Sequence, residues 1–297
     1  MTLPLHRRTV LSGLAACAAA AALRPSAFAA DPGDGAFRFE LPVPFLPERT
    51  MRVWGYVPAR ASGPVVIVMH GQGRNADEYR DFWIEGARAH GLTILAPEFD
   101  RDGFPTSREY NMGRVAEADG GLRPPEARSF SLIGQVFDAA RERLGVDPDG
   151  FTLFGHSAGA QYVHRYMLFT PDARATRAIA ANAGWYTRPV FDQPYPHGAA
   201  EAGLTDADIE RYLAAPLTIM LGDADTDTSQ SSLNTDPEVM VQGPHRFARG
   251  RHVFELARDE AERRGVRFGW SQVIVPDVGH SGDIMSRHAA DLIGGAG

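Results

Sequence analysis

Ser157 stands at the centre of a Gly-x-Ser-x-Gly pattern that runs from Gly155 to Gly159. An apolar segment, 151–154, precedes the pattern, and a helix-forming run, 160–168, follows it. A chain that turns this sharply from strand to helix holds the serine in a strained backbone conformation and exposes its hydroxyl, and the two glycines let strand and helix approach closely. The pattern predicts a nucleophilic serine, with a serine that only caps the helix as the alternative.

A serine hydroxyl becomes a strong nucleophile only when a base takes its proton and an acid orients that base. We expect both partners in loops at the carboxyl ends of later strands. The loop after 217–221 contains Asp223, Asp225 and Asp227, and the loop after 268–275 contains His280. The chain order serine, acid, histidine differs from the orders in the two unrelated serine-protease folds. On the residues alone, any of the three aspartates can be the acid.

These residues also fit less specific roles. The three aspartates resemble the start of a calcium loop, but Thr228 and Asn234 stand where that loop needs glycine and glutamate. We therefore expect no metal site and no cofactor.

Among the 10 histidines, chain order and the preceding glycine favour His280 as the base. His288 falls inside a predicted helix, where a surface or packing role is expected, and His156 is expected to pack beside the serine.

Apolar runs alternate with amphipathic runs along most of the chain. This alternation predicts an α/β fold, with a mostly parallel central sheet covered by helices on both faces, in a single domain over 36–293. A polar segment, 101–128, is expected to form a surface loop, and 185–215 a short lid insertion. The expected strands are 37–41, 51–57, 65–69, 92–96, 151–154, 178–181, 217–221 and 268–275, and the expected helices are 75–90, 130–144, 160–168, 253–264 and 284–292.

Together these motifs resemble the α/β-hydrolase superfamily over about 51–292. Within it they look most like secreted serine esterases related to polyhydroxybutyrate depolymerases and dienelactone-hydrolase-like enzymes. The resemblance implies that Asp225, the last residue of a Gly-x-x-Asp motif, is the acid, and that His280 of the Gly-His pair is the base. Dienelactone hydrolases use cysteine where this chain has Ser157, so their ester or lactone scope does not carry over.

The resemblance also implies an oxyanion hole made by two backbone N–H groups. One donor is Ala158, directly after the nucleophile. The other lies in the His-Gly loop after 65–69, at Gln72, with Gly71 as the alternative. A triple-glycine version of this loop, which leaves more room near the carbonyl, is absent, so crowded tertiary esters are not expected substrates.

Aromatic residues are the candidates for substrate contact. Trp185 and Tyr186 follow the sixth expected strand, where the superfamily places its lid and acyl or alcohol pocket. Phe99 and Phe104 follow the fourth strand and are candidates for the same cleft. The alternative is that these rings only pack the insertion itself. No role follows for the long segment 226–251.

Composition excludes several functions. All 30 basic residues are arginine, so Ser–Lys dyads, Schiff-base chemistry and the lysine-containing phosphate loop are excluded. The formal net charge of −7, with no basic patch interleaved with aromatic residues, argues against nucleic acid as a partner.

The N-terminus has the features of an export signal. Arg7-Arg8 begins an apolar, alanine-rich run, and Ala27-Phe28-Ala29 offers a signal-peptidase site. Residues 1–29 are therefore predicted to be a twin-arginine signal peptide, since the apolar run is short of the roughly 20 residues that span a bilayer. Cleavage removes three arginines and no acidic residue, which takes the formal charge from −7 to −10. Cys17 in a lipobox-like context is an alternative processing site, at which lipidation would anchor the protein to a membrane.

The sequence thus predicts an exported, periplasmic or extracellular serine hydrolase that cleaves carboxylic esters through Ser157, His280 and Asp225 and an acyl-enzyme intermediate. The expected partners are a small or polymeric ester substrate and the twin-arginine export machinery. Two alternatives stay open: a non-catalytic binding protein on the same scaffold, and a triad enzyme that cleaves amide or carbon–carbon bonds.

Overall fold

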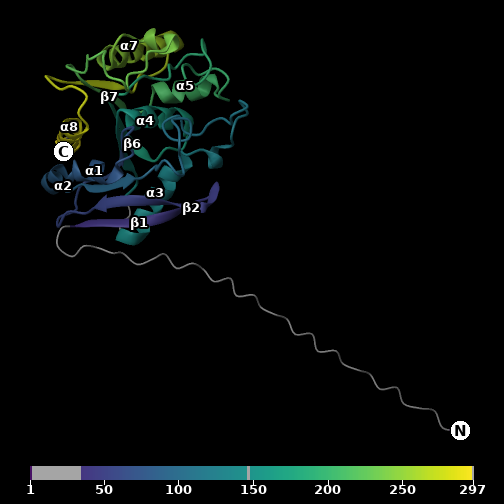
Figure 1. Ribbon diagram of the computed structural model, residues 1–297, viewed down its shortest axis with the longest axis vertical. Helices are drawn as coiled ribbons and strands as arrows, with labels where there is room; N and C mark the ends of the chain where they lie inside the picture. The colour runs from purple at the N-terminus through teal and green to yellow at the C-terminus, as the bar shows by residue number, and fades with distance from the viewer. Residues whose placement is uncertain (2–34, 146–147, 296–297) are drawn as a thin grey trace.

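One eight-stranded sheet organises the computed structural model, which describes Met1 and residues 35–145 and 148–295 (Figure 1). The signal peptide predicted for 1–29 lies outside the described residues apart from Met1. The strand order is β1-β2-β4-β3-β5-β6-β7-β8, antiparallel from β1 to β4 and parallel from there on. The strands are β1 Ala36–Val43, β2 Leu46–Tyr56, β3 Val65–Met69, β4 Thr93–Pro97, β5 Phe151–His156, β6 Ala175–Ala181, β7 Leu217–Gly222 and β8 Ser271–Val275.

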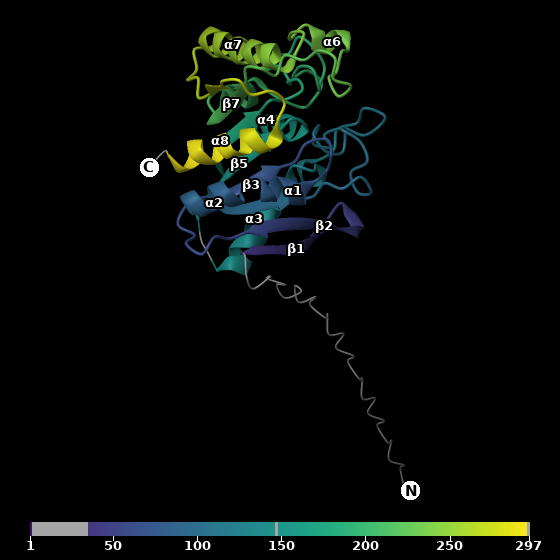
Figure 2. The same ribbon diagram turned by 60° about the vertical axis from the view of Figure 1, so that its left-hand side comes forward.

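Helices cover both faces of this sheet, as the sequence predicts. Helices α1 Ala76–Asp81, α2 Ile84–His90 and α8 Gly282–Gly294 pack on one face, to the left in Figure 1. Four longer helices pack on the other face, and two short ones, η1 and α6, lie within loops (Figure 2). Those six are η1 Pro125–Ala127, α3 Ser131–Leu144, α4 Ala158–Phe169, α5 Asp206–Leu213, α6 Pro237–Met240 and α7 Arg246–Arg264.

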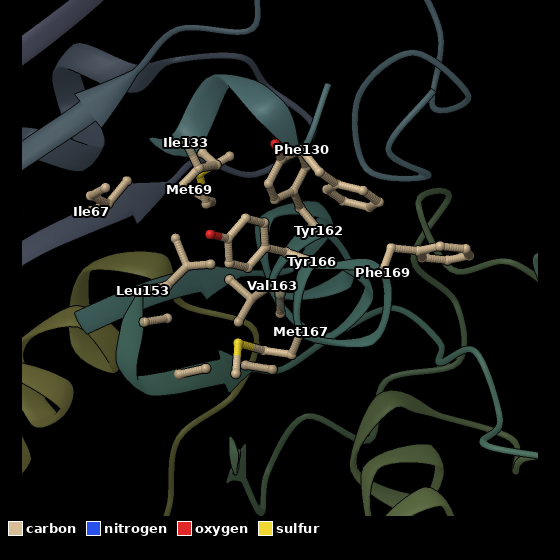
Figure 3. Close-up of a cluster of buried hydrophobic side chains, with 14 of the residues drawn as sticks. Ile67, Met69, Phe130, Ile133, Leu153, Tyr162, Val163, Tyr166, Met167 and Phe169 are labelled. Carbon is tan, nitrogen blue, oxygen red and sulfur yellow. The ribbon is translucent and has the colours of Figure 1, made fainter. Parts of the chain in front are cut away.

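The central strands are apolar because both of their faces are covered. Every residue of β3 and β5 is buried, whereas β1 at the sheet edge alternates between buried and exposed positions. Helix α4 is likewise buried along its whole length. Figure 3 shows its side chains gathered beside those of β3, β5 and the start of α3. Each fully buried aliphatic or aromatic side chain stabilises the fold by about 1.5–3 kcal/mol, so this layer holds β3 and β5 in place.

Two predicted helices have different bounds in the structure. The helix expected over 75–90 breaks at Phe82 and Trp83, where the fully buried Trp83 ring packs edge-on against Phe154 at 4.9 Å between centroids. Helix α7 begins at Arg246 instead of 253, because buried arginines occupy its first turn and hide the apolar periodicity.

The segment 101–128 is largely loop with exposed stretches such as 117–122, as its polarity predicts, but part of it is buried. Tyr110, Asn111 and Val115 are buried, and the Tyr110 hydroxyl donates a hydrogen bond to the His70 carbonyl at 2.6 Å. The segment is therefore folded over the carboxyl end of β3 and β4.

A substitution of Gly159 tests the close contact between β3 and α4. A Cβ at this position would lie 2.1 Å from the Met69 carbonyl oxygen, so Gly159→Ala should lower the free energy of unfolding by about 3 kcal/mol despite the better helix propensity of alanine. Gly134→Ala in α3 is the matched control, because its Cβ meets only the end of the flexible Arg174 side chain, at 3.2 Å. Urea unfolding of the three proteins measures the difference. Equal stability of the two variants would contradict the tight contact.

Candidate active site

Ser157 lies on the sharp turn between β5 and α4. Its backbone has φ 58° and ψ −116°, a conformation that costs about 1–3 kcal/mol for a residue with a side chain. Two hydrogen bonds hold it: its N–H donates to the Ala181 carbonyl at 3.0 Å, and its carbonyl accepts from the Gln161 N–H at 3.1 Å. Gly155 permits the turn, since a Cβ there would lie 2.3 Å from the Gly159 carbonyl. The turn presents the serine hydroxyl above the carboxyl ends of the strands.

Ser157, His280 and Asp225 form one hydrogen-bonded chain. The distance from His280 Nε2 to Ser157 Oγ is 3.0 Å, and the distance from His280 Nδ1 to Asp225 Oδ2 is 2.8 Å. Asp225 is only 1% exposed. A charged carboxylate accepts the Nδ1–H, which leaves the Nε2 lone pair free to accept the serine proton. The arrangement can therefore activate the serine hydroxyl.

The other two aspartates of the loop after β7 serve its turns. An Asp223 carboxylate oxygen accepts the Asp277 N–H at 2.7 Å, and Asp227 accepts the N–H and hydroxyl of Ser229. Neither is a partner of His280 in the structure.

Asn182, which follows β6, joins the loops that carry the acid and the histidine. Its side-chain oxygen accepts the Gly222 N–H at 2.8 Å, and its side-chain nitrogen donates to the Gly279 carbonyl at 3.1 Å. Asn182 was not among the predicted site residues, because its only signal in the sequence is a polar side chain directly after an apolar strand.

His156, which was expected to pack beside the serine, is buried and packs against the ring of His280. The two ring centroids lie 4.6 Å apart, and His156 Nδ1 is hydrogen bonded to the Tyr79 hydroxyl at 2.9 Å. Burial lowers the pKa of His156 well below its usual value, so the ring stays neutral beside the base. His288 is exposed on α8.

Two backbone N–H groups face the space beside the serine. Ala158 and Gln72 both line the cavity there, and among the described residues no protein acceptor takes either N–H. Gly71, the alternative donor, is not among the residues that line this cavity, and it lies against the Tyr79 hydroxyl, since a Cβ on Gly71 would be 2.9 Å from that oxygen. Ala158 and Gln72 are thus the pair that can stabilise a negatively charged oxygen on a carbonyl attacked by Ser157.

His70 fixes the loop that carries Gln72. Its Nε2 accepts the Phe99 N–H at 3.1 Å, and its Nδ1 donates to the Gly71 carbonyl at 2.9 Å. Burial is the main cause that lowers the pKa of His70 to about 3. The ring therefore remains neutral near neutral pH, with its proton on Nδ1. Its Nε2 is then free to accept the Phe99 N–H.

The cavity beside Ser157 has a volume of about 180 Å³ and mostly polar walls. Its lining comes from separate segments: Gln72, Ser107, Asn111, Met112, Ser157, Ala158, Gln161, Gly184, Trp185, Ser232, Asn234 and Arg246. Of these polar residues, only Ser157 and Gln72 were predicted as site residues from the sequence. The other polar residues lie in parts of the sequence that contain no recognisable catalytic or binding motif.

Of the four aromatic residues predicted as candidates for substrate contact, Trp185 lines this cavity, and Tyr186, Phe99 and Phe104 do not. Tyr186 is 1% exposed, and its backbone N–H and carbonyl are both hydrogen bonded to the Gln242 side chain. Phe104 is 2% exposed and packs on Phe99 with 4.8 Å between ring centroids. Both rings are therefore buried among other side chains and do not line the cavity.

The segment 226–251, without a role in the sequence analysis, wraps around the acid. Arg246 contacts Asp225 at 3.5 Å, and both side chains are buried. The guanidinium also donates to the side chains of Gln230 at 2.7 Å and Ser232 at 2.9 Å. The segment thus encloses Asp225 and supplies part of the cavity wall.

Two further features concern the part of the chain that the structure describes. It contains no group of three histidine, cysteine, aspartate or glutamate side chains placed to hold a metal ion. In that same part, no helix has the length and apolar character needed to cross a bilayer.

Comparison with solved structures finds two proteins that are similar to most of this chain. One is the poly(aspartic acid) hydrolase-1 of Sphingomonas sp. KT-1, 41% identical with a TM-score of 0.80, over 82% of this chain and 94% of that one. The other is a poly(3-hydroxybutyrate) depolymerase from Bordetella parapertussis, 40% identical with a TM-score of 0.81, over 86% of this chain and 87% of that one. An S-formylglutathione hydrolase from Agrobacterium tumefaciens, 17% identical with a TM-score of 0.52 over 90% of this chain and 97% of that one, shares the fold. No protein-family model and no curated protein matches the chain.

The buried His70 should make the fold sensitive to acid. With a folded-state pKa of about 3, the ring takes up a proton below pH 6.5 only in the unfolded chain, so stability is lost as pH falls from 6.5 toward 3. Between pH 7 and pH 5 this costs about 2 kcal/mol. Replacement by glutamine, whose side-chain oxygen can accept the Phe99 N–H, should reduce the pH dependence by that amount. Urea unfolding at the two pH values measures it, and an unchanged pH dependence in His70→Gln would refute the assignment.

Proposed function

The chain belongs to the α/β-hydrolase superfamily, among its esterases and depolymerases, and we propose that it is an exported serine hydrolase that uses Ser157, His280 and Asp225 to cleave carboxylic esters. The observation that carries the proposal is the hydrogen-bonded chain from Ser157 through His280 to the buried Asp225. Two relatives about 40% identical to the chain are named as hydrolases of polymers, which supports the reaction class.

The geometry supports a two-step reaction. His280 Nε2 accepts the serine proton while Ser157 Oγ attacks the ester carbonyl, and the resulting oxyanion lies against the N–H groups of Ala158 and Gln72. As the carbon–oxygen bond to the alcohol breaks, His280 returns the proton to the leaving oxygen, and an acyl-enzyme remains on Ser157. His280 then takes a proton from water, whose oxygen attacks the acyl carbonyl and releases the acid and the free serine.

Export is the second part of the proposal. It is supported by Arg7-Arg8, the apolar run after them and the small residues before Ala30. The twin-arginine machinery is then the export partner, and lipidation at Cys17 is the alternative route to a membrane-anchored form. Mass spectrometry of the mature protein distinguishes an N-terminus at Ala30 from a lipid-modified Cys17.

Amide hydrolysis is a second candidate activity of the same site. The relative from Sphingomonas is named for poly(aspartic acid), a polymer whose backbone is linked by amide bonds. The same triad chemistry cleaves amides when His280 protonates the leaving nitrogen.

Replacement of the serine tests the nucleophile. In Ser157→Ala, hydrolysis of short p-nitrophenyl esters should fall by about 10⁴-fold or more, because no acyl-enzyme can form. Unfolding by urea should be little changed, since the alanine keeps the backbone turn. Ser62→Ala, an exposed position at the opposite end of the sheet, is the matched control. Ester turnover by Ser157→Ala at the wild-type rate would rule out the mechanism, and the same variants assayed on poly(aspartic acid) decide whether amides are also cleaved.

A further inference from the structure

Three fully buried arginines surround the cavity beside Ser157. Arg246 lines it directly. Arg249 donates to the carbonyls of two lining residues, Gly184 at 2.8 Å and Asn234 at 2.7 Å. Arg165 donates to the carbonyl of Asn111 at 2.8 Å and to the side-chain oxygen of Gln161 at 3.2 Å, both also in the lining. The wall of the cavity is thus backed by guanidinium groups on several sides.

The three buried arginines around this cavity carry more positive charge than the neighbouring carboxylate can neutralise. Asp225 is the one carboxylate paired with these arginines among the described residues, and it contacts Arg246. Arg165 and Arg249 bond carbonyl and other neutral groups instead. Burial lowers the pKa of each to about 10, so both keep their charge at neutral pH. Three positive charges therefore face one negative charge, in a chain of formal charge −7.

Some donors of these arginines have no partner. Arg246 Nε and Arg165 Nη2 are buried and lack a hydrogen-bond acceptor among the described residues. Trp185, which lines the cavity, lies over the Arg165 guanidinium with 4.3 Å from Cζ to the ring centroid. Such a contact offsets part of the desolvation of a cation, but no protein anion does so. A buried cation without a matching anion is costly, and an anion entering the cavity would relieve that cost.

The rest of the lining accepts an anion without repulsion. No carboxylate stands in it, and its remaining polar side chains are amides and hydroxyls that can donate hydrogen bonds: Gln72, Ser107, Asn111, Ser157, Gln161, Ser232 and Asn234. The volume of about 180 Å³ slightly exceeds the roughly 150 Å³ of a cavity that holds benzene. The space is therefore suited to a short acyl group and not to a long hydrocarbon chain.

We propose that this cavity binds a carboxylate of the substrate through Arg246, so that the preferred substrates are esters whose acyl part carries an anionic group a few bonds from the scissile carbonyl. The inference rests on the proposed hydrolase function and names its substrate class. Arg165 and Arg249 contribute through their charge, which favours an anion across the low-dielectric wall. A free terminal carboxylate and a carboxylate along a polymer present the same group to the site.

A pair of matched esters tests the carboxylate subsite. The mono-4-nitrophenyl ester of glutaric acid carries the carboxylate, and its methyl ester has the same acyl chain without the charge. In the wild type, kcat/KM should be at least about 10-fold higher for the anionic ester, mainly through a lower KM, and added salt should reduce this preference. Equal or lower kcat/KM for the anionic ester would overturn the proposal.

The same ratio in Arg246→Gln separates substrate binding from support of the triad. Loss of the contact with Asp225 should slow both esters alike, so it cancels in the ratio, whereas loss of the carboxylate partner should bring the ratio close to one. Arg258→Gln, an exposed arginine on α7 whose partner is Asp259, should keep the wild-type ratio. An unchanged ratio in Arg246→Gln would show that the arginine only ties loops together, and would overturn the assignment.

Inhibition of the wild type supplies the test if Arg246→Gln does not fold. Glutarate should compete with the ester substrate, and the neutral glutaramide should inhibit at least about 10-fold more weakly. Equal inhibition by the two would overturn the carboxylate subsite.

Turnover of the neutral ester without any anionic preference would leave the proposed hydrolase intact and remove only this inference. Turnover of neither ester would overturn both.

Discussion

The hydrogen bond between the buried Asp225 carboxylate and His280 Nδ1 is the interaction on which the rest of the site depends. It fixes the proton on Nδ1 and aims Nε2 at Ser157. The surrounding structure serves to hold it: Asn182 joins the loops after β7 and β8, His156 packs against the imidazole, and Arg246 closes over the acid. Each of these groups is buried, so the geometry is set before any substrate arrives, and little reorganisation is needed at the moment of reaction.

The same burial produces the charge of the cavity. Arg246 contacts the acid of the triad and also stands in the wall that a substrate would touch. One guanidinium thereby links His280, through Asp225, to the cavity. The chain as a whole carries a formal net charge of −7, whereas the buried arginines place positive charge beside the cavity, which favours an anion at that site. Arg246, in the segment 226–251, thus both contacts Asp225 and forms part of the proposed carboxylate subsite.

Much of the fold and the reacting residues could be predicted because their signals are local. Gly155 and Gly159 are required by backbone contacts within a few residues of Ser157, and fully apolar strands such as β3 identify a sheet covered on both faces. The cavity walls gave no such signal, since side chains from six or more separate segments meet there only in three dimensions. The reverse also occurs. Tyr186 and Phe104 were predicted to contact substrate because they are aromatic residues in loops, but both are buried in the core. The start of α7 was not predicted because its buried positions are occupied by arginines. A prediction based on the spacing of hydrophobic residues does not recognise a buried polar residue.

Covalent labelling of the wild-type protein and of Asp225→Asn by a fluorophosphonate, with the modified peptide identified by mass spectrometry, measures the coupling of these three side chains most directly. A single adduct on Ser157 is expected, formed at least about 100-fold more slowly in Asp225→Asn because His280 loses the charge that orients it. Modification of a different residue, or labelling of the variant at the wild-type rate, would show that the hydrogen-bonded chain does not activate the serine.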